Sequence, residues 1–299
     1  MNAPSSPYRG RFAPSPTGAL HFGSLVAALG SWLRARHAGG TWIVRIEDLD
    51  PPREIAGAAN GQLAALSAFG LASDEPVIWQ HDRHDAYAAA LQQLVAERRA
   101  FACWCSRTDL QRSGGLHRSP CVAAPDATRA PAWRLRVDDE TIGFDDVVLG
   151  RYEQRIAEAV GDFVIRRVEG HFAYQLAVVV DDAAQGITEV VRGADLLDST
   201  PRQILLQRCL ALPTPAYLHL PLALDADGRK LSKQDQALPI RPDDPLPALR
   251  RALTFLGIAP QQLQGLHTVD ALLRQAVAAF DVAAIPRVGS IVHMRHGLS

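Results

Sequence analysis

The apolar positions in the first hundred residues alternate between two patterns along the chain. Short, nearly continuous apolar runs are typical of strands buried in a parallel sheet, and apolar residues three or four apart are typical of helices. The first pattern predicts strands over Tyr8–Ala13, Thr41–Ile46 and 76–79. The second predicts helices over His21–His37 and, approximately, 54–70 and 82–100. Because strands and helices alternate in this order, the sequence predicts an α/β fold with a doubly wound parallel sheet.

The pattern changes near residue 101 and later returns. The middle of the chain is loop-rich, and its features are strand-like runs at Arg134–Val137 and Phe163–Arg167 and an acidic turn over Asp138–Asp146. The alternation then resumes with helices over Tyr174–Ala183 and Thr200–Leu212 and strands over Ile187–Gly193 and Tyr217–Leu224. From Arg241 onward the spacing is all helical, at about 245–257, 260–264 and 268–280. We therefore expect a nucleotide-binding core in two halves (1–100 and 171–238), split by an insertion (101–170) and followed by a short helical segment (239–299).

The composition narrows the class of protein. The chain has 299 residues, of which 47% are hydrophobic, a net charge of −1 and four cysteines. No apolar run is long enough to cross a bilayer, and residues 1–8 have neither the basic nor the apolar stretch of an export signal. Four cysteines do not make a disulfide scaffold in a chain of this length. We expect a cytoplasmic protein with no membrane partner, and the charge argues against non-specific coating of nucleic acid but not against a local basic groove.

The stretch from Arg11 to Ser24 has the pattern of a phosphate-binding turn. A strand ends at two prolines, the chain turns on Gly18, and an apolar helix begins at His21. The amides and the positive dipole end of a helix N-terminus attract an anion, and a glycine lets that anion approach the backbone. Because the sequence has no P-loop signature, a Walker-type ATPase is not expected.

Only two of the 31 basic residues are lysines, Lys230 and Lys233. They lie together in the segment Lys230–Gln234, after the second half of the predicted sheet. Lysine is a compact charge with three donors, which suits a reacting phosphate better than the planar fork of arginine. With His21 on the other side, this loop could hold a triphosphate from both ends and stabilise charge on the α-phosphorus and the leaving pyrophosphate.

These segments and their neighbours resemble the class I aminoacyl-tRNA synthetases of the glutamyl type. His21–Ser24 (HFGS) is similar to the HIGH signature of that family, and Lys230–Gln234 (KLSKQ) is similar to its KMSKS signature. Arg11–Gly18 (RFAPSPTG) and Arg45–Asp48 (RIED) indicate the glutamate branch. Both signatures depart from the family in their last residue, where serine replaces histidine and glutamine replaces serine. The resemblance covers about residues 8–240 and implies a Rossmann-like core that activates glutamate with ATP and Mg²⁺.

The resemblance also assigns residues to the substrates. The implied glutamate site consists of Arg11, Phe12, Ala13, Pro14, Ser15, Glu47, Tyr174 and Arg192. The implied ATP site consists of Gly18, His21, Gly23, Ser24 and Lys233, and the implied catalytic residues are His21, Lys230 and Lys233. Arg11 and Arg192 would pair with the carboxylates of glutamate, Arg192 with that of its side chain, because bidentate pairing selects an acid over an amide. Glu47 would hold the α-ammonium group. Judged without the family, Glu47 is a solvated acid after a strand and Tyr174 a half-buried core residue.

Four residues of the insertion have the composition of a zinc site. Cys103, Cys105, His117 and Cys121 offer three thiolates and one imidazole, the donors that tetrahedral Zn²⁺ prefers. In a loop-rich segment with little core, such a site supplies folding energy. The alternative is three buried cysteines and a surface histidine, and we favour zinc. Related chains often have tyrosine in place of His117. Cys209, alone in an apolar helix, is expected to be a core residue.

The insertion is also rich in arginine. The residues concerned are Arg107, Arg112, Arg118, Arg129, Arg134 and Arg136. This density suits the backbone of an RNA, and it equally suits a solvated face in a chain that prefers arginine throughout. Both interpretations remain open from the sequence.

The acceptor of glutamate is inferred from the length of the chain. A glutamyl enzyme of this family continues into a helical anticodon-binding domain, whereas this chain stops at Ser299. By resemblance we expect a shortened, monomeric paralogue that forms glutamyl-adenylate without tRNA and transfers glutamate to queuosine in the anticodon of tRNA(Asp). One alternative is a truncated enzyme that charges the 3′ end of tRNA(Glu). Others are a nucleotidyl transferase without an RNA acceptor and a non-catalytic binding paralogue, which would be expected to lose Lys233 or His21.

Overall fold

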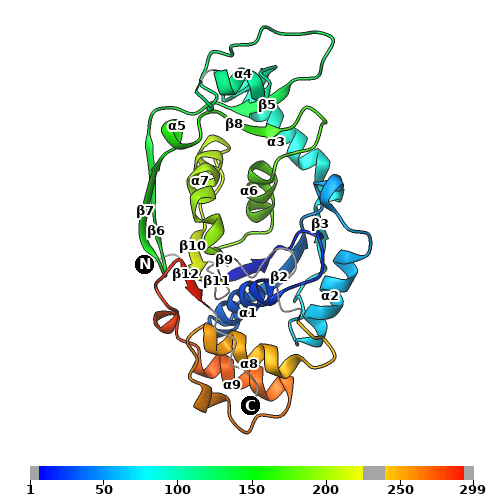
Figure 1. The fold of residues 1–299 in the computed structure, drawn as a ribbon, viewed down its shortest axis with the longest axis vertical. Coiled ribbons are helices and arrows are strands. Elements are labelled where there is room, and N and C mark those ends of the chain that lie inside the picture. The colour runs from blue at the N-terminus through cyan, green and yellow to red at the C-terminus, as the bar shows by residue number, and fades with distance from the viewer. Residues whose placement is uncertain (1–6, 113, 225–239, 293–299) are drawn as a thin grey trace.

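The computed structural model describes residues 7–112, 114–224 and 240–292, and Figure 1 shows an elongated molecule with its main sheet near the middle. The strands are β1 (Arg9–Phe12), β2 (Thr41–Ile46), β3 (Ile78–Trp79), β4 (Ala100–Cys103), β5 (Ala132–Leu135), β6 (Thr141–Asp146), β7 (Gly150–Arg155), β8 (Phe163–Arg166), β9 (Glu189–Gly193), β10 (Ala216–Leu220), β11 (Leu222–Leu224) and β12 (Ser290–Val292). The helices are α1 (Phe22–His37), α2 (Ala58–Ala68), α3 (His84–Ala96), α4 (Arg107–Arg112), α5 (Ile156–Ala159), α6 (Tyr174–Ala184), α7 (Thr200–Cys209), α8 (Pro245–Phe255) and α9 (Val269–Ala279). Short 3₁₀ turns include η1 (Pro51–Arg53), η2 (Gln80–Arg83), η3 (Ala194–Ser199), η4 (Pro260–Leu263) and η5 (Val282–Ala284).

Parallel strands from both halves of the chain form the centre of the fold. β2 pairs with β1 and β3, and β10 pairs with β9 and β6, all in parallel. The two groups meet where the Thr188 N–H donates to the carbonyl of Arg9, 3.0 Å away. The second half of the core therefore continues the sheet that the first half begins.

The side chains of β2 divide between two hydrophobic cores. Trp42, Val44 and Ile46 belong to the core formed with α1, α8 and α9, whereas Ile43 belongs to the core formed with α3, α6 and α7. Successive residues of a strand point to opposite faces, so a strand covered on both faces is apolar along most of its length, and Arg45 is the buried charged exception in β2. This arrangement confirms the predicted doubly wound sheet with helices on both faces.

The middle of the chain contains more regular structure than its sequence predicted. β4, β5 and β8 form an antiparallel sheet, and β6 and β7 form an antiparallel hairpin. The acidic turn expected over Asp138–Asp146 is wrong, because Thr141–Asp146 is a strand that also pairs with β10. Ile142 and Phe144 alternate with polar positions and are buried, which is the pattern of a half-buried strand. The acidic residues concealed that alternation.

The expectation of a purely helical segment after Arg241 is also wrong. α8 and α9 form as expected, but β12 then pairs in parallel with β11. The strand predicted over Tyr217–Leu224 is divided at Pro221 into β10 and β11, because proline lacks the N–H of a regular ladder. The domain boundaries given above stay a proposal. Across the described residues, no helix combines the length and apolar character needed to cross a lipid bilayer.

Candidate active site and metal centre

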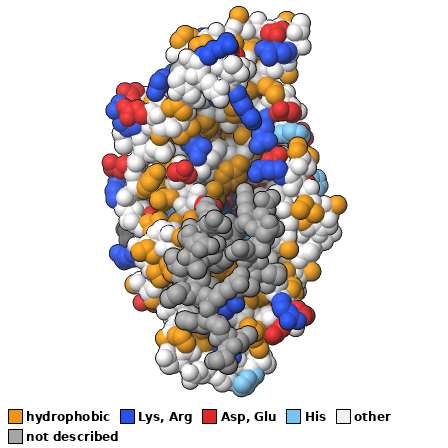
Figure 2. Space-filling view, in the orientation of Figure 1, with side chains coloured by type: hydrophobic (Ala, Val, Ile, Leu, Met, Phe, Trp, Pro, Cys, Tyr) orange, Lys and Arg blue, Asp and Glu red, His pale blue; other side chains and the backbone are white. Residues whose placement is uncertain are grey.

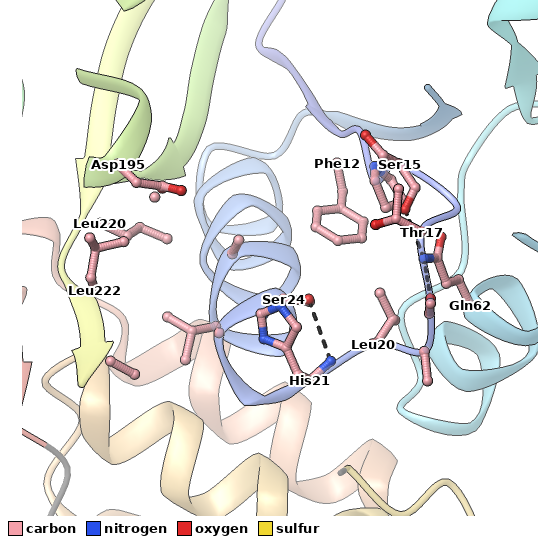
Figure 3. Close-up of a pocket in the computed structure, with 18 of the residues that line it drawn as sticks. Phe12, Ser15, Thr17, Leu20, His21, Ser24, Gln62, Asp195, Leu220 and Leu222 are labelled. Atoms are coloured by element: carbon pink, nitrogen blue, oxygen red, sulfur yellow. Dashed lines mark hydrogen bonds between the residues drawn. The ribbon is translucent and has the colours of Figure 1, made fainter. Parts of the chain in front are cut away.

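His21 is fixed at the N-terminus of α1 by a reciprocal cap. Its Nδ1 accepts a hydrogen bond from the Ser24 N–H (3.2 Å), and the Ser24 Oγ accepts one from the His21 N–H (3.4 Å; Figure 3). A Cβ at position 23 would lie 3.1 Å from His21 Cε1, so the glycine there lets the ring fold back over the first turn. The serine that replaces the last histidine of the HIGH signature therefore has a structural part, since it closes the capping box.

This cap also decides which nitrogen of His21 carries hydrogen. Because Nδ1 accepts from a backbone amide, a neutral ring has its hydrogen on Nε2. Burial lowers the pKa of His21, although the charge of Asp195 opposes the change. At neutral pH the ring is therefore uncharged and offers an Nε2–H donor.

His21 lines a cavity of about 750 Å³ beside the helix N-terminus. Phe12, Ser15 and Thr17 lie on one side of it, and Asp195, Leu220 and Leu222 lie on the other (Figure 3). The residues predicted to bind ATP that the structure describes all line this cavity; they are Gly18, His21, Gly23 and Ser24. Lys230 and Lys233 lie outside the described residues. The structure thus brings together the predicted ATP-binding residues that lie at the N-terminus of α1 and in the turn before it.

Gln62, which the sequence did not single out, holds the turn of this cavity from behind. Its Nε2 donates to the carbonyl of Ser15 (3.0 Å) and to that of Gly18 (2.7 Å). Gly18 has φ of +146°, a conformation that other residues rarely adopt. One amide side chain on α2 therefore fixes both ends of a turn that only glycine can complete. A polar residue among the apolar positions of a predicted helix was the available signal.

A second cavity of about 350 Å³ adjoins the first. Of the residues predicted to bind glutamate, seven line it: Arg11, Phe12, Ala13, Ser15, Glu47, Tyr174 and Arg192. Pro14 lines the larger cavity instead, and its carbonyl accepts from the Glu47 N–H (2.9 Å). Both cavities share wall residues, among them Phe12, Ser15 and Gly193. A molecule in the smaller cavity can therefore reach a molecule in the larger one.

Arg192 is a buried cation whose partners are all neutral. Its side chain donates to His219 Nε2 (3.1 Å), Tyr174 Oη (3.3 Å), the Leu196 carbonyl (3.3 Å) and Thr200 Oγ1 (2.8 Å). The residue is 5% exposed, and it forms no ion pair with any residue in the described part of the chain. A guanidinium has five N–H donors, so one remains after these four bonds. Arg192 thus brings to the smaller cavity a positive charge that no ion pair within the described residues compensates.

Arg11 and Glu47 belong to a buried ionic network that the sequence did not predict. Arg11 pairs with Asp182 through Nε (3.1 Å) and Nη2 (3.3 Å), which leaves Nη1 without a hydrogen bond within the described residues. Arg45 donates to Asp182 (2.8 Å) and to Glu47 (3.1 Å). Burial acts to raise the pKa of Asp182, but Arg11 and Arg45 outweigh it and the pKa is lowered. The adjacent acids Asp181 and Asp182 in the apolar helix α6 were the signal in the sequence.

Glu47 has a different electrostatic setting from Asp182. Burial raises its pKa, and the nearby Arg45 and Arg11 only partly oppose the rise. A cationic ligand beside this carboxylate would favour its charged form. Glu47 is therefore suited to an ammonium group.

The four predicted metal ligands come together in the insertion. The ligand atoms of Cys103, Cys105, His117 and Cys121 all lie within 4.8 Å of one another. Donors bound to one zinc ion lie roughly 3.5–4 Å apart, given Zn–S of about 2.3 Å and Zn–N of about 2.0 Å. Burial, followed by the two neighbouring thiols, raises the pKa of Cys121 to about 12. Such a thiol ionises at neutral pH when a cation compensates its charge.

His117 has the surroundings of a ligand rather than of a surface histidine. It is 3% exposed, and its buried Nε2 has no hydrogen-bond partner among the residues that the structure describes. Its Nδ1 lies 2.9 Å from Oδ2 of the buried Asp162, which can fix the tautomer that leaves Nε2 unprotonated. Arg134 donates to Cys103 Sγ (3.3 Å) and to the Asp162 carbonyl (2.8 Å). These contacts are consistent with a cation that the four residues of the cluster coordinate tetrahedrally.

The arginines of the insertion do not form one class. Arg107, Arg112, Arg118 and Arg129 are exposed, whereas Arg134 and Arg136 are half-buried. Arg134 contacts the metal cluster and Arg136 lies 4.9 Å above the ring of Phe101. Basic and acidic side chains are interspersed on the face seen in Figure 2. Arg134 and Arg136 therefore have structural contacts, and among the four exposed arginines Arg129 pairs with Asp126 at the surface (2.8 Å).

Cys209, expected in the core, is partly buried against the core that contains α6 and α7. It accepts a hydrogen bond from Arg99 Nε (3.2 Å). This cysteine belongs to the packing of α7 and not to the metal cluster.

Comparison with known proteins places this geometry in one family. The family described as "tRNA synthetases class I (E and Q), catalytic domain" matches residues 8–129 and 121–285. A relative from Xanthomonas oryzae pv. oryzae, named "Glutamyl-Q tRNA(Asp) synthetase", is 60% identical over 285 residues, which are 95% of this chain and 94% of the relative. A relative of the same name from Burkholderia cenocepacia is 54% identical over 294 residues, or 94% of this chain and 99% of the relative.

A solved structure has the same fold. The crystal structure of a glutamate tRNA ligase from Elizabethkingia meningosepticum, in complex with its amino acid, superimposes with a TM-score of 0.81 at 24% identity. The match covers 95% of this chain and 67% of that one.

Proposed function

Since the chain belongs to the family of class I tRNA synthetase catalytic domains for glutamate and glutamine, we propose that it activates glutamate with ATP. We propose that it then transfers the glutamate to queuosine in the anticodon of tRNA(Asp). The observation that carries the first step is the pair of adjoining cavities, one with an uncompensated guanidinium and one at a helix N-terminus. The second step is supported by relatives named "Glutamyl-Q tRNA(Asp) synthetase" that match nearly their whole length.

Glutamate is proposed to occupy the smaller cavity. Its side-chain carboxylate pairs with Arg192, its α-ammonium group lies against Glu47, and Tyr174 and Ser15 complete the walls. Arg11 is held by Asp182, and its Nη1, which has no hydrogen bond within the described residues, would donate to the α-carboxylate. A guanidinium that forms no ion pair within the described residues favours an acid over its amide, because only the acid supplies the missing negative charge.

ATP, with Mg²⁺, is proposed to occupy the larger cavity. An α-carboxylate oxygen of glutamate attacks the α-phosphorus, a new P–O bond forms, and the bond to pyrophosphate breaks. His21 donates its Nε2–H to a phosphate oxygen, and Gly18 and Gly23 leave room for the nucleotide. Lys230 and Lys233, outside the described residues, are proposed to neutralise the leaving pyrophosphate.

The activated glutamyl group then passes to RNA. A nucleophile of queuosine attacks the glutamyl carbonyl, and AMP leaves. We propose that the monomer is the active form. We propose the cytoplasm, where tRNA and ATP meet, as its location.

The first step predicts pyrophosphate exchange without RNA. With ATP, Mg²⁺ and glutamate, the protein is expected to incorporate labelled pyrophosphate into ATP in the absence of any tRNA. Glutamine and aspartate should support exchange at least 100-fold less well, because neither places a carboxylate on Arg192 at the right distance (the magnitude follows the cost of an unpaired buried group). The exchange assay with nuclease-treated protein checks this, and no exchange with glutamate would refute the proposed activation.

Zinc is proposed as the ion of the metal cluster. Cys103, Cys105, His117 and Cys121 would hold it, and Asp162 would orient His117 through Nδ1. When bound, zinc supplies folding energy to a segment that has few apolar residues of its own. None of its four proposed ligands lines either cavity, so we assign it a structural part.

The zinc proposal predicts the zinc content of the wild type and a different zinc content for two cysteine variants. The wild type is expected to contain about one zinc per chain, since four ligands close a structural site. Cys103→Ala is expected to lose it and to unfold at lower temperature, whereas the matched variant Cys209→Ala keeps it, because Cys209 lies outside the cluster. Elemental analysis together with thermal unfolding measures both. Unchanged zinc in Cys103→Ala would contradict the assignment.

A further inference from the structure

Arg192 meets a fully buried histidine at the back of the smaller cavity. His219, on β10, accepts the Arg192 Nε–H at Nε2 (3.1 Å), and its side chain has no exposed surface. Neither sequence pattern nor the family assignment gives His219 a part in the site. Of the four acceptors of Arg192, His219 is the one that holds Nε, and this contact helps to fix the plane of the guanidinium that faces glutamate.

The hydrogen bond requires one tautomer of His219. Nε2 can accept only if the ring hydrogen is on Nδ1, and Asp146 Oδ2 lies 2.7 Å from that nitrogen. Asp146 is itself fixed, because it accepts from the backbone N–H groups of Val148 (3.0 Å), Leu149 (2.8 Å) and His219 (3.0 Å). The carboxylate therefore holds the hydrogen on Nδ1 and frees Nε2 as an acceptor.

The surroundings favour the neutral ring. Burial lowers the pKa of His219, and the charge of Arg192 adds to that effect, while Asp146 opposes it. A ring with hydrogen on both nitrogens would point an N–H at the N–H of Arg192. The chain of groups works only with an ionised Asp146, a neutral His219 and a charged Arg192.

We propose that Asp146 and His219 are positioning residues for glutamate, which orient Arg192 so that its free donor edge faces the side-chain carboxylate. This inference rests on the proposed glutamate activation and deepens it. The carboxylate, imidazole and guanidinium come from β6, β10 and β9, three adjacent strands of the sheet. Their order across the sheet sets the direction of the guanidinium in the cavity.

The alternative is that His219 only fills space. Its ring stacks on Tyr217 (centroids 6.3 Å apart, 11° between planes) and lies 6.2 Å from Phe144, as a packing residue would. The two accounts differ in one property: positioning needs an acceptor at the place of Nε2, and packing needs only volume.

Two substitutions of His219 separate these accounts. His219→Leu removes the acceptor, and His219→Gln keeps a carbonyl that can reach the place of Nε2. In glutamate-dependent pyrophosphate exchange, we expect His219→Leu to raise KM for glutamate about 10- to 100-fold, with KM for ATP and kcat within about threefold, because the contact is equal in ground and transition states. His219→Gln is expected to recover most of the loss.

Asp146→Asn provides a second, independent arm. Its amide would place N–H groups against Nδ1 and favour the wrong tautomer, so KM for glutamate should rise as in His219→Leu. The matched control is Asp145→Asn, next in the chain but exposed, which should change nothing. Melting temperatures of all variants separate misfolding from loss of orientation.

The possible outcomes decide between the proposals. If the wild type exchanges and folded His219→Leu keeps its KM for glutamate within twofold, or His219→Gln is impaired as much as His219→Leu, the positioning inference is wrong and the proposed function stands. If the wild type shows no exchange at all, both are wrong.

Discussion

Replacing Arg192 by glutamine is expected to lower kcat/KM for glutamate in pyrophosphate exchange by roughly 10²- to 10⁴-fold. Leaving one member of a buried ion pair without its partner costs about 3–5 kcal/mol, and each factor of ten corresponds to about 1.4 kcal/mol. The pair in question would form between the guanidinium, 5% exposed, and the side-chain carboxylate of the substrate. KM for ATP should stay nearly unchanged, because Arg192 lines only the smaller cavity.

The matched control is Arg208→Gln. Arg208 is an exposed residue of α7 that pairs with Glu140 at the surface (3.4 Å), so the same substitution there should leave exchange and stability nearly unaltered. Arg192→Lys should recover little, because an ammonium group cannot reproduce the planar fork that His219 and Thr200 hold. A folded Arg192→Gln protein with kcat/KM close to that of the wild type would remove Arg192 from the glutamate site.

The sequence predicted the parts of the fold that local patterns determine. The strand Thr41–Ile46 and the helix that ends at His37 agree with β2 and α1, because continuous apolar runs and helical spacing leave little choice. The β6–β7 hairpin was missed because most of its charged residues lie on exposed positions and conceal the apolar alternation; the buried Asp146 is the exception. β12 was missed for another reason: it pairs with β11, some seventy residues earlier in the chain, and no local pattern reveals such a partner.

In the candidate site too, the sequence identified the residues of local motifs and missed their distant partners. Residues within motifs, such as Arg11, His21 and Glu47, were found because the motif names them. Their supports were not found: Asp182 beside Arg11, Gln62 behind the turn at Ser15–Gly18 and His219 beside Arg192 each come from an element distant in the sequence. A buried polar residue in an apolar strand or helix is the general signal, since it must be paired to be tolerated. The sequence contains that signal, but only the structure gives the partner.

The largest expected effect on glutamate transfer is the difference between tRNA(Asp) with queuosine and the same tRNA without it. Queuosine-bearing tRNA(Asp) should accept glutamate, and the same tRNA with guanosine at that position should accept none, because the proposed nucleophile belongs to the modified base. Removal of the 3′-terminal adenosine should not matter, since the 3′ ribose takes no part in the proposed transfer. A ligase of the usual kind would give the opposite pattern on tRNA(Glu).

The proposed function is tested most directly by locating labelled glutamate on RNA. The protein is incubated with ATP, labelled glutamate and one of three RNAs: tRNA(Asp) with queuosine, the same tRNA without it, or tRNA(Glu). After ribonuclease digestion, the label should appear only with the first RNA and only in its anticodon fragment. Label at the 3′ end of tRNA(Glu), or in tRNA(Asp) regardless of queuosine, would contradict the proposed acceptor, and absence of label from every RNA would leave glutamate activation without the transfer we propose.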